Sequence, residues 1–329
     1  MKAKNICICM ALAISFSFTG CAETSTAGTT EPISVSSGEM PDNETTISAA
    51  TTDNKADTTT SAASAQEVTV PTEDDTAVSA NKATIAEAVI FDDAGIKITA
   101  KGFDHDSFMG PKLKLLIEND SGTDKIIQCR NFSVNGYMIE TTMSANVANG
   151  KKANDGITIL TNSLEKSGIT EIADMEFSFH IVESDDFSSY YGTELIQIRT
   201  SIADTYEYRF DDSGTPVYEK DGIRIVIKGR GEDQAFGPSV TMYTENNSGR
   251  DIIVQTDDSS VNGFMIDTVC SSEVTAGKHA VDAITFYRSQ LEENDITDIQ
   301  DVELSFRIVD AHDLGSVIKT DPVSFSVGN

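Results

Sequence analysis

The sequence contains no tryptophan, and its 24 lysine and arginine residues are outnumbered by 53 aspartates and glutamates. Without Trp, there are few aromatic platforms on which a sugar or another flat ligand could stack. The formal net charge of -29 argues against binding to nucleic acid, whose phosphates require a basic surface. It also argues against electrostatic attachment to anionic lipid. These features argue against nucleic acid and anionic lipid as partners, but they do not identify the actual partner.

The N-terminal segment reads as a processing signal. Lys2 and Lys4 precede an apolar run from Ile6 to Phe18, which is too short to cross a bilayer as a helix but suits the apolar region of a signal peptide. The run ends in Phe18-Thr19-Gly20-Cys21, which resembles the lipobox of bacterial lipoproteins, in which the cysteine is lipidated and becomes the new N-terminus. We therefore expect residues 1–20 to be a lipoprotein signal peptide and Cys21 to carry the lipid. The alternative is an ordinary secretory signal with a coincidental cysteine.

Cysteine is scarce in the remainder of the chain. Cys7 and Cys9 lie in the signal, so that only Cys129 and Cys270 follow Cys21. A secreted chain of this size with two cysteines is not a disulfide scaffold. Both lie in apolar, strand-like surroundings, and we expect buried, unreactive thiols.

Residues 21–82 have a different composition from the rest. After Cys21 the segment is rich in Ser, Thr and Ala and has no aromatic residue. Such a segment buries too little apolar surface to offset the entropy cost of ordering. We expect a disordered tether with an end-to-end distance on the order of 40–45 Å. A glycosylated, mucin-like stalk is the alternative.

The rest of the chain is an internal duplication. The segment that starts at Gly95 (GIKITAKG) returns at Gly222 (GIRIVIKG), 127 residues further on, and the match continues without a gap to the C-terminal region. Ser133-Val134-Asn135-Gly136, for example, returns as Ser260-Val261-Asn262-Gly263. A period this long is a whole domain rather than a solenoid unit. We expect two tandem domains, named here the first repeat (83–204) and the second repeat (205–329).

Each repeat has the period-two pattern of strands. Met175, Phe177, Phe179 and Ile181 alternate with polar residues, which puts one set on the core face and the other in water. Asn135-Gly136 and Asn262-Gly263 suit tight hairpin turns. Seven or eight short antiparallel strands per repeat, with about one helical turn at Ser163–Ser167, indicate an all-β fold of two immunoglobulin-like antiparallel β-sandwiches.

The lipobox, the spacer and the duplicated glycine and strand pattern together resemble immunoglobulin-like tandem-domain lipoproteins of Gram-positive bacteria. The resemblance covers residues 1–21 and about 84–329. It implies a fold and a location at the outer face of the cytoplasmic membrane, exposed toward the cell wall. Its motifs are turn glycines and core strands, so it transfers no catalytic residue.

The sequence offers few candidate groups for catalysis or metal binding. None of the four histidines (His105, His180, His279 and His312) has a counterpart histidine in the other repeat or a His or Cys at metal-ligand spacing, and we expect them to be solvated. Several acids occur in both repeats: Asp106 and Asp233, Asp124 and Asp251, Asp155 and Asp282, and Asp174 and Asp301. We interpret them as solvated loop acids, since no pair stands out as a glycosidase dyad. No motif of a hydrolase, kinase or metalloprotease is present.

Two segments partly match a calcium-binding loop. Asn131-x-Ser133-x-Asn135-Gly136 and Asp258-x-Ser260-x-Asn262-Gly263 resemble the start of an EF-hand, but the glutamate required at position twelve is absent, as is a preceding helix. A hairpin turn explains the glycines better. A looser oxygen site between loops is the alternative, and we expect no cofactor or metal.

The sequence therefore predicts a membrane-anchored extracellular lipoprotein that displays two β-sandwiches and is not an enzyme. Its expected partners are the membrane, through the lipid on Cys21, and a protein or glycan of the cell envelope or of a host. The acidic charge favours a basic or cation-bridged partner. A passive envelope spacer and a wall-active enzyme are the alternatives, and a solute-binding lipoprotein is disfavoured because it would alternate strands with helices.

Replacement of Cys21 with Ala should abolish membrane attachment, because no later residue offers an anchor in this sequence. Cell fractionation followed by blotting should find an unprocessed precursor or a released protein. A fully processed Cys21→Ala protein that stays in the membrane fraction would contradict the lipid assignment.

Overall fold

A computed structural model describes residues 82–185, 190–233, 237–315 and 317–327. The predicted signal peptide, Cys21 and nearly all of the predicted tether lie outside these residues. The described residues all belong to one compact unit, Asp75–Asn329. Within them, no helix is long and apolar enough to cross a membrane.

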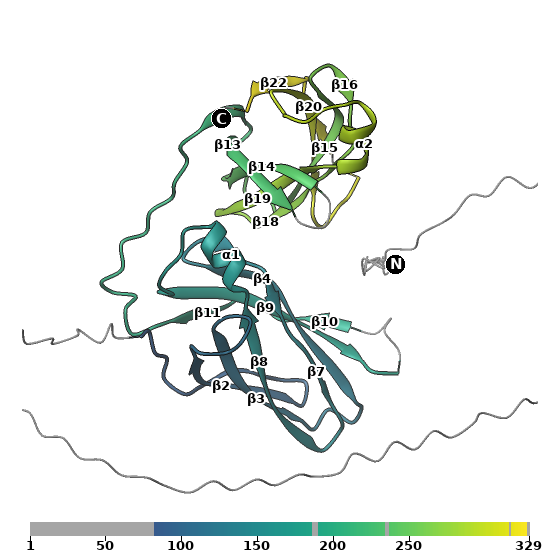
Figure 1. The fold of residues 1–329 in the computed structure, drawn as a ribbon. Coiled ribbons are helices and arrows are strands. Elements are labelled where there is room, and N and C mark those ends of the chain that lie inside the picture. The colour runs from purple at the N-terminus through teal and green to yellow at the C-terminus, as the bar shows by residue number, and fades with distance from the viewer. Residues whose placement is uncertain (1–81, 186–189, 234–236, 316, 328–329) are drawn as a thin grey trace, which may run out of the picture. The chain divides into compact units, whose positions relative to one another are not determined.

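The described structure is all-β, as predicted, with two single-turn helices (Figure 1). The helices are α1 (Thr161–Lys166) and α2 (Arg288–Glu293), and α1 agrees with the helical turn expected near Ser163. Each repeat contains eleven described strands rather than seven or eight. The difference arises because the chain after each Asn-Gly turn forms three strands of only two to four residues, which period-two patterns are too short to indicate.

In each repeat, two antiparallel sheets face each other. The first repeat has a five-stranded sheet in the order β1-β2-β3-β8-β6. Its members are β1 (Ala88–Asp93), β2 (Ile96–Asp104), β3 (Lys112–Asn119), β6 (Thr141–Thr142) and β8 (Lys151–Ile159). The opposite sheet consists of β4 (Lys125–Val134), β5 (Tyr137–Met138), β7 (Ser144–Val147), β9 (Asp174–Glu183), β10 (Tyr190–Gly192) and β11 (Ile196–Arg199).

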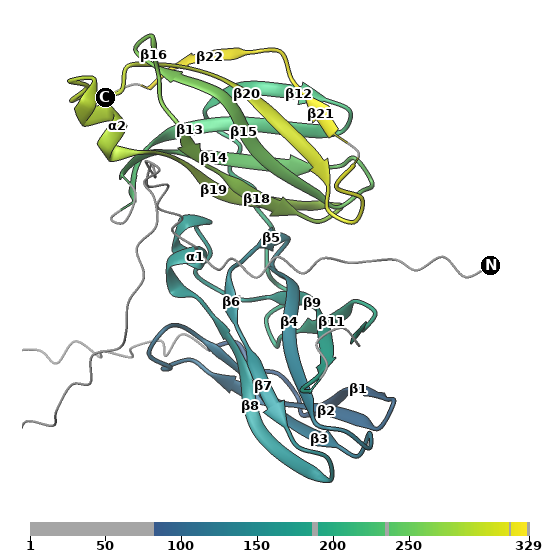
Figure 2. The same ribbon diagram turned by 90° about the vertical axis from the view of Figure 1, so that its right-hand side faces the viewer.

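The second repeat has the same arrangement, and Figure 2 shows β15 and β20 side by side in it. The counterparts of the five-stranded sheet are β12 (Thr215–Lys220), β13 (Ile223–Asp233), β14 (Gly237–Asn246), β17 (Thr268–Val269) and β19 (Lys278–Phe286), and they form one eleven-stranded sheet with β4, β5, β7, β9, β10 and β11 of the first repeat. The opposite sheet consists of β15 (Ile252–Val261), β16 (Phe264–Met265), β18 (Ser271–Val274), β20 (Asp301–Asp310), β21 (Val317–Lys319) and β22 (Val323–Ser326).

The strands of the two repeats pair in the same register and have β-bulges at equivalent positions. A β-bulge interrupts the pairing of β4 with β9 between Arg130 and Ser133, and another interrupts β15 with β20 between Asp257 and Ser260. The extra residue has a positive φ in both cases, 52° at Asn131 and 50° at Asp258. Bulges bend a strand and redirect the side chains that follow. These two lie just before the Asn-Gly hairpins and therefore direct both hairpins in the same way.

The alternating strands form the core, as the pattern predicted. Met175, Phe177, Phe179 and Ile181 are essentially inaccessible to solvent. One apolar cluster lies mainly in the first repeat and also includes Val226, Tyr243 and Val281 of the second, and another cluster fills the second repeat. The two repeats therefore share part of one core, and the proposed boundary between residues 204 and 205 stays a prediction.

Both Asn-Gly pairs form the predicted hairpin turns. The φ angles are 50° and 84° at Asn135 and Gly136, and 51° and 86° at Asn262 and Gly263. Val134 pairs with Tyr137 across the first turn, and Val261 pairs with Phe264 across the second. Positive φ at both central residues matches the right-handed twist of the flanking strands. These segments are hairpins, and the interpretation of their glycines as part of a calcium loop is not needed.

A buried asparagine closes each sandwich near the turn that follows β3 or β14. Asn246 is fully buried, and its Nδ2 donates to the carbonyl oxygens of Arg250 and Val274 at 2.7 and 2.8 Å. Its Oδ1 accepts from the amide and the hydroxyl of Ser248. Asn119 makes the equivalent four bonds in the first repeat. In both repeats the amide is therefore a fully satisfied buried group.

Replacement of Asn119 or Asn246 with Ala should reduce the free energy of unfolding by about 2–3 kcal/mol, because several buried polar groups lose their partners. Asn247→Ala, which removes an exposed amide bonded to Glu245, is the matched control and should cost less than about 0.5 kcal/mol. Urea unfolding followed by circular dichroism measures all three. Equal stabilities for Asn246→Ala and Asn247→Ala would contradict the assigned role.

Candidate functional site

The structure does not bring the residues considered for catalysis or metal binding together. Within the described ranges, no group of three or more His, Cys, Asp or Glu side chains is placed to hold a metal ion. His105 contacts the carbonyl oxygen of Ala83, and His312 contacts Asp251 at 2.9 Å. The histidines thus have separate local partners and do not form one site.

The two cysteines that follow Cys21 are free thiols. Cys129 is buried in β4, and Cys270 lies half-buried between β17 and β18. Burial raises the pKa of each thiol to about 12. Both thiols stay protonated near neutral pH, which agrees with the prediction that they are unreactive.

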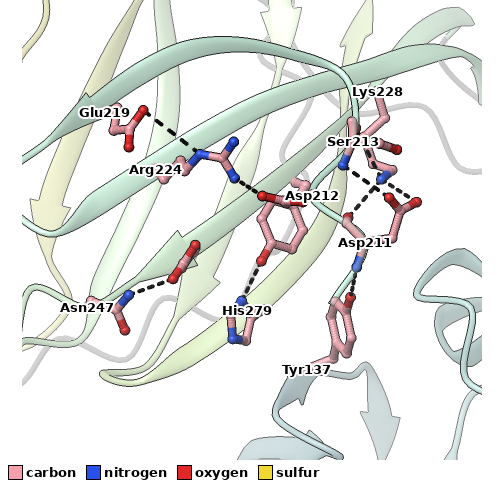
Figure 3. A network of polar contacts seen from close by, with 11 residues as sticks. Tyr137, Asp211, Asp212, Ser213, Glu219, Arg224, Lys228, Asn247 and His279 are labelled. Atoms are coloured by element: carbon pink, nitrogen blue, oxygen red, sulfur yellow. Dashed lines mark hydrogen bonds and ion pairs between the residues drawn. The ribbon is translucent and has the colours of Figure 1, made fainter. Parts of the chain in front are cut away.

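His279 departs from the prediction that all histidines are solvated. It lies half-buried at the start of β19, and its Nδ1 is 2.6 Å from the Tyr243 hydroxyl (Figure 3). The ring of Phe210 stacks on the His279 ring at 3.8 Å between centroids and an interplanar angle of 19°. Burial lowers the pKa of His279 and favours the neutral ring. The prediction was wrong because covering residues from elsewhere in the chain cannot be seen in the local sequence.

One of the covering residues comes from the first repeat. Tyr137, in the β4–β5 hairpin, lies 5.3 Å from the Phe210 ring and 5.8 Å from the His279 ring. The backbone amide of His279 donates to the carbonyl oxygen of Gly136 at 2.9 Å. This contact is a short parallel bridge between β5 and β19. It joins a sheet of the first repeat to a sheet of the second.

The segment before β12 completes the contact (Figure 3). The amide of Asp211 donates to the Tyr137 hydroxyl at 3.2 Å. Lys228 donates to the carboxylate and the carbonyl oxygen of Asp211 at 2.7 and 2.8 Å and holds the pKa of that carboxyl far below its usual range. Arg224 pairs with Asp212 beside it. These bonds hold the connecting chain, and Phe210 with it, on the sheet of the second repeat.

A salt bridge and an apolar contact lie beside the rings. Lys278 donates to Glu176 at 2.7 Å, with side chains only 16% and 18% exposed. Met138 packs against the core of the second repeat, and its sulfur lies 3.4 Å from the Thr275 hydroxyl. We call this set of contacts the junction: Gly136, Tyr137, Met138, Glu176, Phe210, Asp211, Tyr243, Thr275, Lys278 and His279. The junction is a packing contact between the two repeats, since each of its polar groups already has a hydrogen-bond or ion-pair partner.

The second repeat carries the same hairpin without a cover. Phe264 and Met265 stand at the positions of Tyr137 and Met138, and they are 48% and 69% exposed, whereas Tyr137 is 4% exposed. A Cβ at Gly136 would lie 3.1 Å from the Phe210 ring, but one at Gly263 would meet no atom of the described residues within 4 Å. Two adjacent exposed apolar residues on a tight turn form a candidate binding site, which we call the free hairpin (Gly263–Met265).

The free hairpin is held in a fixed shape. Asn262 donates from Nδ2 to the Asp298 carbonyl oxygen, and its Oδ1 accepts from the amides of Gln300 and Asp301. Asn135 makes the equivalent bonds to Glu171, Ala173 and Asp174. Sequence reasoning identified both turns but assigned no role to the residues after them. Apolar residues follow the Asn-Gly turn in both repeats, and this repeated feature could have marked the hairpins as contact sites.

Comparisons with known proteins place the chain in no family. No family model and no curated protein matches it. Among solved structures, the YadV chaperone is similar over 71% of this chain and 100% of its own, with 9% identity and a TM-score of 0.20. The Salmonella enterica SafA pilin in complex with the SafB chaperone matches over 66% and 89%, with 10% identity and a TM-score of 0.18. Red sea bream transglutaminase matches over 74% and 31%, with 6% identity and a TM-score of 0.18. Likenesses this weak carry no argument about this protein.

The two turn glycines form a matched pair that isolates the junction. Gly136→Ala and Gly263→Ala should each cost about 1–2 kcal/mol, because both residues have a φ near +85°. Only Gly136→Ala also displaces the Phe210 ring, so only this variant should increase amide hydrogen exchange in residues 205–214. Mass spectrometry measures the amide hydrogen exchange of this segment. Equal exchange in the two variants would contradict the packing of Phe210 over the hairpin.

Proposed function

We propose that the protein is a lipid-anchored, non-catalytic binding module. In this proposal Cys21 carries the lipid at the outer face of the cytoplasmic membrane, and residues 22–82 form the spacer that extends toward the cell wall. The two β-sandwiches are displayed at the end of that spacer. Their ligand is a protein or glycan of the envelope or of a host.

The free hairpin is the observation that carries the proposal. Its counterpart in the first repeat is a protein-contact element, whose Tyr137 is buried against the second repeat. Adjacent exposed aromatic and methionine side chains are typical of contact surfaces. Because Asn262 fixes the turn, the hairpin loses little conformational entropy when it binds. A passive spacer would have no use for such residues at this position.

The acidic net charge limits the chemical class of the expected ligand. The net charge of -29 disfavours an acidic polymer and favours a basic partner or one bridged by cations. Around the free hairpin, Asp298, Asp301 and Glu303 line two open grooves that also include Gly263. A ligand that combines an apolar contact with a basic group therefore fits this surface.

Binding of residues 22–329 to isolated cell envelopes tests the proposal. The protein should bind saturably, and the double variant Phe264→Asp/Met265→Asp should bind at least tenfold more weakly, since it places charge where apolar side chains make contact. Leu314→Asp is the matched control, because Leu314 is an exposed apolar residue of the same repeat (59% exposed) outside the hairpin. It should bind like the unmodified chain.

Two results would overturn the proposal. Binding that never saturates and is the same for all three proteins would indicate a passive spacer. Hydrolysis of a wall glycan or peptide by residues 22–329, lost on replacement of one carboxylate, would indicate an enzyme.

A further inference from the structure

The junction consists of two complementary halves that lie on different repeats. One half is the hairpin Gly136–Met138 with Glu176 beside it. The other half is the start of β19, where the ammonium of Lys278 pairs with Glu176 and the amide of His279 donates to the carbonyl oxygen of Gly136. Because the chain is duplicated, each repeat has both a hairpin half and an edge half. The junction uses the hairpin half of the first repeat and the edge half of the second.

The unused hairpin half is the free hairpin, with Glu303 at the position of Glu176. Glu303 lies exposed on β20. The unused edge half is the start of β8, where Lys151 and Lys152 stand at the positions of Lys278 and His279. Both lysines are exposed.

Among the described residues, the start of β8 has no strand partner on the side that corresponds to the junction side of β19. Lys152 pairs with Glu118 of β3 in the same register in which His279 pairs with Glu245 of β14. On its other side, among the strands that the structure describes, β8 is paired only with β6, at Thr158 and Ile159. Since successive amides of a strand alternate between its two sides, the amide of Lys152 points to the open side, as that of His279 does. An unpaired edge of this kind accepts another backbone.

The charges of the two unused halves match those of the junction. Glu176 and Lys278 form a bridge in which both side chains are largely buried. Their counterparts Glu303 and Lys151 have the same charges and are both exposed. A contact that places Phe264 beside Lys152 also places these two charges at the same relative positions.

Three of the remaining differences between the halves are compatible with the same contact. Tyr137 accepts a hydrogen bond from Asp211, whereas Phe264 has no hydroxyl and needs no such donor. Where His279 lies beside the Tyr137 ring, Lys152, whose ammonium group pairs with Glu118, offers its aliphatic stem to the Phe264 ring. Thr275, which touches Met138, is replaced by the exposed apolar Ala148 opposite Met265.

We propose that the free hairpin of one molecule binds the β8 edge of another molecule of this chain, so that the protein associates head to tail. The inference rests on the proposed binding role of the free hairpin and names its partner. Because the two halves are different surfaces, the contact is heterologous, and it extends into rows unless its rotation closes a ring. Attachment to one membrane raises the effective concentration of such molecules.

Site-directed cross-linking of residues 22–329 tests the pairing. Adjacent β-strands bring opposed residues close enough for a disulfide, so a mixture of Phe264→Cys and Lys152→Cys chains should form a cross-linked dimer under mild oxidation. Neither variant alone should do so. Tyr137→Cys/His279→Cys is the positive control, since this pair is opposed within one chain. The unmodified chain, with Cys129 and Cys270 of high pKa, is the background.

Sedimentation analysis provides a second readout. The unmodified chain should associate with increasing concentration, and Met265→Asp should weaken the association at least tenfold. Lys151→Glu should weaken it as well, and mixing Lys151→Glu chains with Glu303→Lys chains should restore it. Leu314→Asp should associate like the unmodified chain.

A Phe264→Cys chain that cross-links with itself as readily as with Lys152→Cys would overturn the head-to-tail pairing. Absence of both the mixed cross-link and concentration-dependent association would overturn self-association altogether. If envelope binding in that case still depends on Phe264 and Met265, the proposed function stands and the partner is another protein or a glycan. If neither association nor envelope binding depends on them, both proposals fail.

Discussion

The side chain of Asn135 is the constraint on which the junction depends. It holds the β4–β5 hairpin against the segment before β9 through three hydrogen bonds, to Glu171, Ala173 and Asp174. Since Asn135 and Gly136 both have a positive φ, the turn is tight and Tyr137 follows it directly. The carbonyl oxygen of Gly136 and the ring of Tyr137 thereby reach β19 together. A looser turn would present the same atoms at a much larger entropic cost.

The junction combines many individually modest contacts. A ring contact contributes about 0.5–1.5 kcal/mol beyond the area it buries, and a hydrogen bond contributes about 0.5–1.5 kcal/mol net. The salt bridge of Lys278 with Glu176 is largely buried, so its attraction is partly cancelled by desolvation. Such a contact gains its specificity from the simultaneous fit of backbone, ring and charge. The same logic applies to the unused halves, which reproduce the backbone and the charge but differ in the rings.

Duplication followed by divergence explains why the two repeats play different roles. The repeats share core strands, bulges and turns, and their strand registers agree. They differ at the positions that face outward near the junction, where Tyr243 and His279 of the second repeat correspond to Leu116 and Lys152 of the first. Outward-facing positions are free to change because core packing does not constrain them. Two of these differences, Tyr243 and His279, take part in the junction.

Much of the fold could be predicted from the sequence because its signals are local. Alternation at Met175–Ile181 specified buried faces, Asn-Gly specified hairpins, and the 127-residue offset specified duplication. Each of these depends on neighbours in the chain, through the pleat of a strand or the φ angles of a turn. The expected strand number was too low, because two-residue strands leave no periodic pattern.

The candidate site could not be predicted in the same way. His279 was expected to be solvated, yet Phe210 and Tyr137, which lie 69 and 142 residues away along the chain, cover it. The side chains of Asn119 and Asn246 are buried, and each bonds to a carbonyl group 28 residues further along the chain. The sequence by itself determined the strands, the turns, the repeat and the acidic surface. Only the tertiary structure decided which of two equivalent hairpins is covered and which is exposed, because burial is a property of distant chain segments brought together and not of local sequence.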